Sequence, residues 1–261
     1  MRLDLLLVRR GLCSGRERAK EEIRAGHVLV EGKIETRPGR EVPEDAQVLL
    51  TGDTLRYVSR GGLKLEKALD VFGICPEGKI CLDCGASTGG FTDCLLQRGA
   101  AKVYALDVGS GQLAEKLRAD PRVVSREKFN VRQLRPGDLP ECPELTVIDL
   151  SFISLRLILP AVSQVLTPEG EIVCLVKPQF EAGRSRVGKK GVVRDKSVHC
   201  DILEELFLFF PTLGLYPAGL SWSPIRGPEG NIEYLCRLRR QPAGSPPDPR
   251  AVVEEAHNAL K

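Results

Sequence analysis

A glycine-rich stretch is the part of the sequence whose residue types best suit the binding of a small molecule. Asp83-Cys84-Gly85-Ala86-Ser87-Thr88-Gly89-Gly90-Phe91-Thr92 follows an apolar run, and its small residues let backbone approach a ligand before a helix that we expect to open at Thr92. The glycines lack the G-x-G-x-x-G spacing of dinucleotide-binding proteins, and no Lys-Ser/Thr pair follows them as in a Walker A loop. The stretch therefore suits a ligand without a pyrophosphate.

An acidic residue stands at the end of the next predicted strand. Asp107 closes the run 103–107, about 20 residues past the loop, where a carboxylate can accept hydrogen bonds from ribose hydroxyls. The loop and Asp107 together favour a nucleoside ligand. The alternative is a glycine turn of another α/β protein, with Asp107 merely at a strand end.

Cysteines and histidines form no recognisable metal or catalytic set. The nine cysteines are an odd number, and only Cys81 and Cys84 have C-x-x-C spacing, without a second pair or a flanking histidine. We interpret this pair as part of a buried strand and expect no metal. Scattered, odd-numbered cysteines without a secretory signal predict reduced thiols in a cytoplasmic protein.

Strand and helix patterns alternate through most of the chain. Strands are expected at 80–84, 103–107, 123–124, 147–150, 172–176, 219–222 and 232–238, and helices at 92–98, 113–119, 155–166 and 197–210. This alternation predicts an α/β doubly wound sheet. A proline-rich linker over 241–249 and a short closing helix over 250–261 follow.

The first part of the chain, up to about Tyr57, predicts a small α+β module. The expected elements are a helix that stops at Gly11, a helix capped by Ser14, a hairpin over 27–33 that turns at Glu31-Gly32, and short strands at Val42 and 48–50. The segment from Thr54 to Gly62 is interpreted as a hinge between this module and the α/β part.

Charge is nearly balanced over the whole chain, so its distribution matters more than its sum. The net charge is +3, but residues 1–40 contain ten Lys and Arg against six acids, and the loop 184–194 has five cations and no acid. Such segments suit RNA phosphates; a solvated loop is the alternative. With 5% aromatic residues, recognition of folded RNA by shape is favoured, although Phe152, Phe180 or Trp222 can flank one flipped nucleotide.

Several long motifs occur in order along the chain. They are Ser59-Arg60-Gly61-Gly62-Leu63-Lys64-Leu65, the glycine-rich stretch, Asp149-Leu150-Ser151-Phe152-Ile153-Ser154-Leu155 and Val176-Lys177-Pro178-Gln179-Phe180-Glu181-Ala182-Gly183. This set resembles the TlyA family of ribosomal-RNA 2′-O-methyltransferases, historically called hemolysins. The N-terminal module, with Arg2-Leu3-Asp4, Gly11, Arg16 and Gly26-His27-Val28, resembles an S4-type RNA-binding domain. Cys84 departs from the family pattern, in which an aliphatic residue is usual.

The resemblance implies a fold and a set of site residues. The fold would be a Rossmann-like class I methyltransferase sheet with an S4-type domain, divided as 1–58, 59–240 and 241–261. The cofactor would be S-adenosyl-L-methionine. The implied catalytic tetrad is Lys64, Asp149, Lys177 and Glu233; the implied cofactor residues are Asp83, Gly85, Ala86, Ser87, Thr88, Gly89, Gly90, Phe91, Asp107 and Asn130. We assign RNA binding to Arg2, Arg16, Arg18, Lys20, Arg60, Arg184, Arg186, Lys189 and Lys190.

The tetrad leads to a hypothesis for proton removal. A lysine is a base only when neutral, and deprotonating one with the reference pKa of about 10.4 at pH ~7.4 costs about 4 kcal/mol. A neighbouring ammonium group lowers this cost, whereas carboxylates raise it. We expect Lys177 to accept the proton, Lys64 to favour its neutral form and hold the oxygen, and Asp149 and Glu233 to orient the lysines.

Three functions compete at this point. The first is methylation of a cytidine ribose in 16S RNA, 23S RNA or both, with ribosomal RNA or ribosomal subunits as partner. The second is a non-catalytic RNA-binding protein on the same scaffold, which would be expected to lack a tetrad member or Asp107. The third is a hemolysin, which needs an apolar segment longer than 206–210, the densest apolar run. The first is favoured, and membrane insertion is not expected. The sequence leaves the oligomeric state open.

Overall fold

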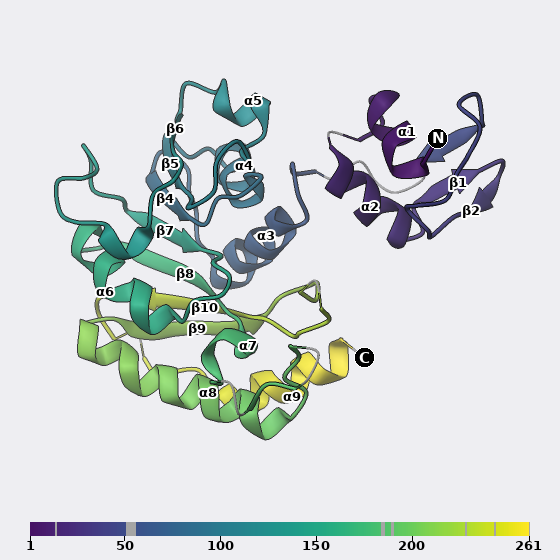
Figure 1. Ribbon diagram of the computed structural model, residues 1–261. Helices are drawn as coiled ribbons and strands as arrows, with labels where there is room; N and C mark the ends of the chain where they lie inside the picture. The colour runs from purple at the N-terminus through teal and green to yellow at the C-terminus, as the bar shows by residue number, and fades with distance from the viewer. Residues whose placement is uncertain are drawn as a thin grey trace. The chain divides into compact units, whose positions relative to one another are not determined.

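The computed structural model describes residues 1–13, 15–50, 56–183, 186–188, 191–227, 229–242 and 244–260. They belong to two compact units, Met1–Ser59 and Arg60–Lys261. Figure 1 draws the first unit in purple and dark blue, and the second from blue to yellow.

The N-terminal unit packs two helices with a small antiparallel sheet. Its elements are α1 (Leu3–Arg9), α2 (Arg16–Arg24), β1 (Val28–Val30), β2 (Lys33–Ile34) and β3 (Val48–Leu50), with the strands in the order β2-β1-β3. Leu3, Leu6 and Leu7, which recur at helical spacing on α1, are buried in the core of this unit. The burial of one helix face explains why these short helices form.

Most local predictions for this unit are confirmed. β1 pairs with β2 around Glu31-Gly32, where both residues have positive φ, 50° and 71°. The expected strand at Val42 is wrong, because the Val42 amide donates to the carbonyl of Met1 and the neighbouring Glu41 forms only an isolated bridge. Ser14 lies outside the described residues; α2 is preceded by Gly15.

The larger unit contains a seven-stranded sheet in the order β6-β5-β4-β7-β8-β10-β9. β4, β5, β6, β7 and β8 run parallel, and β10 is antiparallel to both β8 and β9. The doubly wound α/β class is therefore confirmed. The strands are β4 (Ile80–Cys84), β5 (Lys102–Leu106), β6 (Val123–Arg126), β7 (Leu145–Ile148), β8 (Glu171–Val176), β9 (Tyr216–Trp222) and β10 (Tyr234–Arg239).

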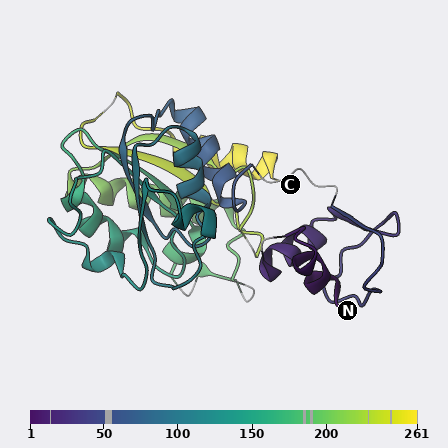
Figure 2. The ribbon, with the colours of Figure 1, turned by 90° about the horizontal axis from the view of Figure 1, so that it is seen from above.

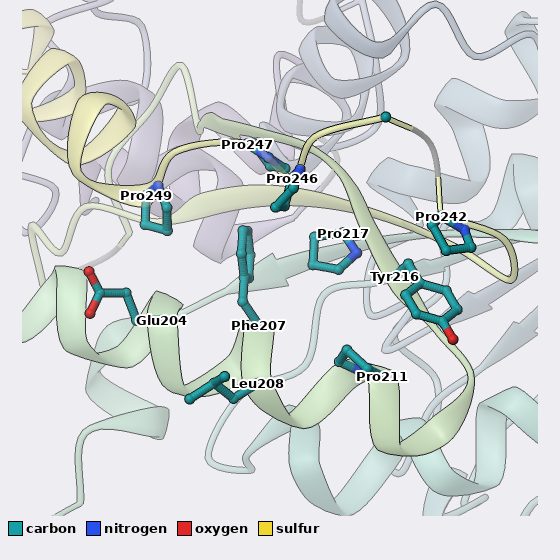
Figure 3. Close-up of a pocket in the computed structure, with 11 residues that line it drawn as sticks. Glu204, Phe207, Leu208, Pro211, Tyr216, Pro217, Pro242, Pro246, Pro247 and Pro249 are labelled. Carbon is teal, nitrogen blue, oxygen red and sulfur yellow. The ribbon is translucent and has the colours of Figure 1, made fainter.

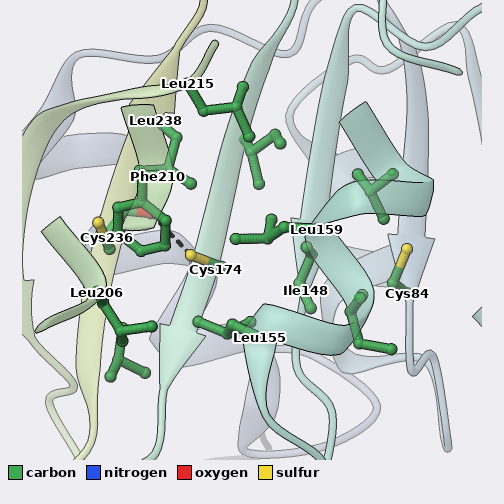
Figure 4. Packing of buried hydrophobic residues seen from close by; sticks show 14 of the residues in the cluster. Cys84, Ile148, Leu155, Leu159, Cys174, Leu206, Phe210, Leu215, Cys236 and Leu238 are labelled. Carbon is green, nitrogen blue, oxygen red and sulfur yellow. Dashed lines mark hydrogen bonds between the residues drawn. The ribbon is translucent and has the colours of Figure 1, made fainter. Parts of the chain in front are cut away.

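Helices cover both faces of this sheet (Figures 1 and 2). One face carries α3 (Gly61–Phe72), α4 (Gly90–Gln97) and the short α5 (Glu115–Arg118), and the other carries α6 (Leu155–Val165) and α8 (Lys196–Phe209). Ile172, Cys174 and Val176 alternate along β8 and join α6 and α8 in one buried cluster, part of which Figure 4 shows. All six residues of β8 are buried, and the alternating direction of their side chains decides which helix layer each one faces.

Four further elements occur in the described part of this unit. They are η1 (Val131–Gln133), α7 (Pro178–Glu181), η3 (Phe210–Leu213) and α9 (Pro249–Ala259). Ion pairs join α9 to α8, with Lys196 2.7 Å from Glu254 and Arg250 3.0 Å from Glu204. The closing helix therefore packs within the larger unit.

The helix α3 is not among the helices that the sequence predicts. The hinge interpretation covered Thr54 to Gly62; Thr54 lies outside the described residues, and Gly61 and Gly62 form the first turn of α3. Two glycines weaken a helix start. The buried face of α3, which includes Leu65 and Leu69, overrides this local preference.

Candidate active site

The glycine-rich loop leaves the carboxyl end of β4 and lies against the end of β7. Gly85 has a φ of +90°, and a Cβ atom there would be 2.6 Å from the backbone oxygen of Asp149. Gly89 has a φ of +98°, and a Cβ atom there would be 2.8 Å from the side chain of Leu113. Only glycine suits positions with both a left-handed backbone and no room for a side chain. Gly85 therefore brings the loop close to Asp149, and Gly89 brings it close to Leu113.

The carboxylate of Asp107 lies against this loop. Its Oδ2 accepts a hydrogen bond of 2.8 Å from the Ser87 amide, and its Oδ1 accepts one of 2.7 Å from the Gly109 amide. Ser87 has a φ of +49°, which is uncommon for a residue other than glycine, and the bond to Asp107 stabilises it. Asn130 lies on a neighbouring segment, because the Phe129 amide donates to the Asp107 carbonyl at 2.9 Å.

Asp83 lies beneath the loop instead of on its surface. Its side chain is fully buried; Oδ2 accepts a hydrogen bond of 2.7 Å from the Thr92 hydroxyl, and Oδ1 has no hydrogen-bond partner among the described residues. Burial raises the pKa of Asp83 to about 7, and the hydrogen bond from Thr92 acts in the opposite direction. A buried carboxyl with one free oxygen is stabilised in its charged form by a cation nearby.

The loop continues into the start of α4. The first intrahelical bond runs from the Asp93 amide to the Gly89 carbonyl at 2.8 Å, so the amides of Gly90 and Phe91 precede the helical ladder. Such amides at a helix start favour a carboxylate ligand. Ala86 and Phe91 are buried, Thr88 is half-buried, and Ser87 is exposed.

The four tetrad residues come together at the same edge of the sheet. Asp149 and Lys177 follow the parallel strands β7 and β8, and Glu233 precedes the antiparallel strand β10. Because Tyr234 of β10 pairs with Val176 of β8, the residue before β10 meets the residue after β8. Lys64 reaches this point from the second turn of α3.

Ion pairs connect the four side chains in a row. Lys64 Nζ lies 2.5 Å from Glu233 Oε2 and 3.8 Å from Asp149 Oδ2. Lys177 Nζ lies 2.5 Å from Asp149 Oδ1 and donates a hydrogen bond of 3.2 Å to Ser151 Oγ. The side chains of Lys64, Lys177 and Glu233 are 10%, 9% and 1% exposed, so solvent screens these charges weakly.

The two lysines have different surroundings. Burial lowers the pKa of Lys64, but the charges of Asp149 and Glu233 outweigh burial and raise this pKa above its ordinary value. Lys64 is therefore a cation at neutral pH. Lys177 contacts one carboxylate and one hydroxyl, and it is the lysine with the weaker set of anionic partners.

Comparison with known protein families assigns both units. Residues 57–240 match the FtsJ-like methyltransferases, and residues 1–48 match the S4 domain. The chain belongs to the FtsJ-like methyltransferase family. The Rossmann-like methyltransferase sheet and the N-terminal S4 domain are thereby confirmed.

Relatives of this FtsJ-like methyltransferase cover nearly its whole length. A Bacillus subtilis protein, YqxC, provisionally named an rRNA methyltransferase, is 51% identical over 100% of this chain and 95% of its own. The 16S/23S rRNA (cytidine-2′-O)-methyltransferase TlyA of Mycobacterium tuberculosis is 46% identical over 92% of this chain and 90% of its own. A solved Streptococcus thermophilus structure, provisionally named a hemolysin, has a TM-score of 0.82 and 46% identity, covering 100% of this chain and 96% of that one.

Two of the predicted RNA-binding residues also hold the N-terminal unit of the methyltransferase together. Arg2 and Arg16 each contact the buried carboxylate of Asp4 at 3.0 Å. Hydrogen bonding from Arg2, with Arg16 also contributing, holds the pKa of Asp4 at about 2 against the effect of burial. The side chains of Arg2 and Arg16 remain 43% and 48% exposed, so phosphate can still reach them.

Two further predicted cations of this unit pair with carboxylates of their own helix. Arg18 contacts Glu22, and Lys20 lies 2.5 Å from Glu17. The sequence assignment omitted Arg24 and Lys33, although both are exposed and have no ion pair among the described residues. Counting charges does not reveal which cations have partners.

The basic loop is described only in part. Arg184, Lys189 and Lys190 lie outside the described residues. Arg186 donates hydrogen bonds to the Ala182 carbonyl at 2.9 Å and to Glu205 at 3.3 Å. Its guanidinium group therefore already has partners within the protein. Arg60 is exposed at the start of α3, one turn before Lys64.

Two aromatic side chains follow tetrad residues closely in the sequence, Phe152 after Asp149 and Phe180 after Lys177. Phe152 is 90% exposed, has a positive φ of 64°, and its ring centroid lies 5.1 Å from that of Phe180. By contrast, the ammonium group of Lys67 lies 3.9 Å from the ring centroid of Trp222 and covers one face of it. Of the three candidate rings, Phe152 is the most accessible to a nucleotide base.

Glu181 is a site residue that the sequence reasoning missed. It follows Lys177 in the same motif, and its carboxylate accepts hydrogen bonds from the Ser154 hydroxyl at 2.6 Å and the Leu155 amide at 2.8 Å. These bonds tie α7 to the start of α6, and therefore the segment after β8 to the segment after β7. Nothing in residue spacing identifies this partner.

An apolar pocket of about 540 Å³ lies elsewhere, between α8, the start of β9 and the proline-rich segment (Figure 3). Figure 3 shows the ring of Phe207 projecting between Pro217 and Pro249. The pocket contains no residue of the tetrad or the glycine-rich loop. Its lining residues are Glu204, Phe207, Leu208, Pro211, Tyr216, Pro217, Pro242, Gly244, Pro246, Pro247 and Pro249.

Within the described ranges, no group of three or more His, Cys, Asp or Glu is arranged to hold a metal ion. No helix in the described part of the chain is long and apolar enough to span a bilayer.

Proposed function

We propose that this protein transfers a methyl group from S-adenosyl-L-methionine to the ribose 2′-hydroxyl of a cytidine in ribosomal RNA, in the small subunit, the large subunit or both. The observation that carries the proposal is the row Glu233–Lys64–Asp149–Lys177 beside the glycine-rich loop. The name of the Mycobacterium tuberculosis relative, which specifies this reaction, supports the substrate class.

The residues around the loop fit this cofactor. Asp107 offers carboxylate lone pairs for the ribose hydroxyls, and the first amides of α4 offer donors for the amino-acid carboxylate. The free oxygen of Asp83 lies below the loop, where a positive ligand favours its ionised form. Asn130 lies beside Asp107 and is our candidate for the adenine edge. The remaining contacts would come from Gly85, Ala86, Ser87, Thr88, Gly89, Gly90 and Phe91.

S-adenosyl-L-methionine supplies an electrophilic methyl group, so the protein's own work is alignment of the hydroxyl and removal of its proton. We assign proton removal to Lys177. Lys64 stays charged between two carboxylates, and its ammonium group lies 3.8 Å from Asp149, the carboxylate that also pairs with Lys177. Once protonated, Lys177 is stabilised by Asp149 at 2.5 Å.

Lys64 and Glu233 have supporting roles in this scheme. As a permanent cation, Lys64 donates a hydrogen bond to the developing alkoxide oxygen and stabilises its charge. Glu233, almost fully buried, holds the ammonium group of Lys64 at 2.5 Å. Asp149 contacts both lysines and sets the distance between them.

RNA capture would use both units. We assign phosphate contacts to Arg2, Arg16, Arg18, Lys20, Arg60 and the loop 184–194. Such contacts give affinity that falls with salt, but they carry no base information. Phe152 is positioned to stack on the flipped target base next to Lys177.

Transfer of labelled methyl tests the proposal. The substrates are unmodified small subunits, large subunits and the free 16S and 23S RNAs, followed by mapping of the modified ribose. Lys177→Ala should abolish labelling, whereas Lys196→Ala, which removes a surface ion pair with Glu254, should not. Cofactor binding without label on any RNA would refute the proposed function. Single-turnover rates that show no lysine titration would refute the assignment of Lys177 alone.

A further inference from the structure

The C-terminal end of the basic loop is held by a buried asparagine. Asn231 is 2% exposed. Its Oδ1 accepts a hydrogen bond of 3.0 Å from the Val193 amide, and its Nδ2 donates one of 2.9 Å to the Gly191 carbonyl. Both the oxygen and the nitrogen of the side-chain amide therefore bond to the backbone of the loop.

A buried histidine holds the same loop end. His199 Nε2 lies 2.9 Å from the Val193 carbonyl, and because a carbonyl only accepts, Nε2 must carry the hydrogen. Nδ1 then accepts from the Tyr234 hydroxyl at 2.7 Å. Burial lowers the pKa of His199 to about 4, so this neutral tautomer persists at neutral pH. His257 of α9 also approaches His199, at 3.4 Å.

Asn231 and Tyr234 flank Glu233 on one short segment. The Asn231 carbonyl accepts a hydrogen bond of 2.9 Å from the Gly227 amide, and a Cβ atom at Gly227 would lie 2.7 Å from Glu233 Oε1. The segment 231–234 therefore both hydrogen-bonds to the end of the loop and carries Glu233, whose carboxylate pairs with Lys64. The end of the loop and the tetrad are thus connected through the same short segment of backbone.

Arg194 directly follows Val193, whose backbone Asn231 and His199 hold. It is exposed and has no ion pair among the described residues. An exposed cation on a fixed backbone suits a phosphate contact, because its backbone loses little conformational entropy when the phosphate binds.

We propose that Asn231 and His199 are positioning residues that hold the end of the basic loop, with Arg194, at a fixed place relative to Glu233 and Lys64. An RNA phosphate bound by Arg194 then helps to place the target ribose at the tetrad. This inference rests on the proposed function, since it assumes that the loop contacts ribosomal RNA. Neither residue touches the substrate in this scheme; both act through the backbone of residues 191–193.

The salt dependence of RNA binding tests the inference. For B-DNA each phosphate contact contributes about 0.9 to the slope of log affinity against log salt, and we take the same value for a duplex region of the RNA. Arg194→Ala should reduce this slope by about 0.9. Asn231→Ala and His199→Ala should reduce the slope by a similar amount, although neither change removes a charge at neutral pH. In these variants a rise from 50 to 200 mM salt should therefore weaken RNA binding about threefold less than in the wild type.

Matched variants distinguish a positioning role from a general loss of folded structure. His199→Gln keeps a donor for the Val193 carbonyl and should restore the wild-type slope, and Asn258→Ala, a surface change on α9, should leave it unchanged. In the double variant Asn231→Ala with Arg194→Ala, the second change should reduce the slope no further. The affinity for S-adenosylhomocysteine should stay at the wild-type value in all of them. If Asn231→Ala does not fold, the His199 pair decides the result.

Two outcomes overturn the inference in different ways. A wild-type slope in Asn231→Ala and His199→Ala, in a protein whose wild type methylates ribosomal RNA, would overturn the positioning role and leave the proposed function intact. A wild-type protein that neither binds nor methylates any ribosomal RNA would overturn both. The methyl-transfer assay on the wild type therefore distinguishes the two failures.

Discussion

The buried carboxyl of Asp83 should make the stability of the larger unit depend on pH. Asp83 is fully buried, and its pKa rises from 3.8 to about 7 because burial disfavours the charged form. Between these two values the folded state binds more protons than the unfolded state, so stability falls as the pH rises from about 4 to about 7. The difference corresponds to about 4 kcal/mol once Asp83 is ionised in both states.

Asp83→Asn should remove this dependence while keeping an acceptor for the Thr92 hydroxyl. The gain in unfolding free energy of the variant over the wild type should be smallest near pH 4, should grow by at most about 1.4 kcal/mol per pH unit, and should level off above pH 7. Urea unfolding followed by the fluorescence of Trp222, the single tryptophan, reports on this unit. Thr92→Val, which removes a hydrogen bond to the ionised form, should extend the window to higher pH. A gain that is the same at pH 4 and pH 8 would refute the reasoning.

Three further predictions concern the proposed site. Gly227→Ala should lower the single-turnover rate by on the order of 10- to 100-fold without changing cofactor affinity, because the added methyl group displaces the Glu233 carboxylate; an unchanged rate would contradict the close approach. Asp107→Ala should weaken binding of S-adenosylhomocysteine by on the order of 10- to 100-fold in calorimetry, and an unaltered dissociation constant would exclude Asp107 as a ribose contact. Phe152→Ala should leave the melting temperature unchanged, since the ring is 90% exposed, but should raise the dissociation constant for RNA by about 5- to 150-fold; equal RNA affinity would rule out stacking on Phe152.

The parts of the site that are local in sequence were the ones that residue patterns could predict. A strand that runs into closely spaced small residues and then a helix produces the loop over 85–90, and Asp107 lies at the end of the next strand for the same topological reason. The alternative, in which Asp107 merely ends a strand, is weakened by the two amide hydrogen bonds that fix its carboxylate at the loop.

Contacts between distant segments could not be predicted in this way. No spacing rule relates Lys64 to Glu233, and their assignment came from family resemblance alone. The helix α3, which delivers Lys64, was missed because Gly61 and Gly62 favour a flexible segment when considered locally. Burial of Leu65 and Leu69 against the sheet decides the conformation instead.

Charge patterns were the least reliable guide, because they do not show pairing. Arg2 and Arg16 belong to a local excess of cations, yet both contact Asp4, whose buried carboxylate requires them. Their substitution should therefore disturb folding as well as RNA affinity. Exposed Arg24, without an ion pair among the described residues, is a cleaner test of RNA binding by this unit.

The reversal of β10 explains how four residues that are distant in the sequence meet at a single edge of the sheet. Parallel strands place the residues that follow them, here Asp149 and Lys177, at a common edge. An antiparallel strand places the residue that precedes it at that edge, and the pairing of Tyr234 with Val176 sets Glu233 opposite Lys177. Glu233 can then bind Lys64 while Asp149 contacts both lysines. Reversing the direction of β10 would carry Glu233 to the far edge and leave Lys64 with one distant carboxylate, so the mixed sheet is a requirement of this tetrad.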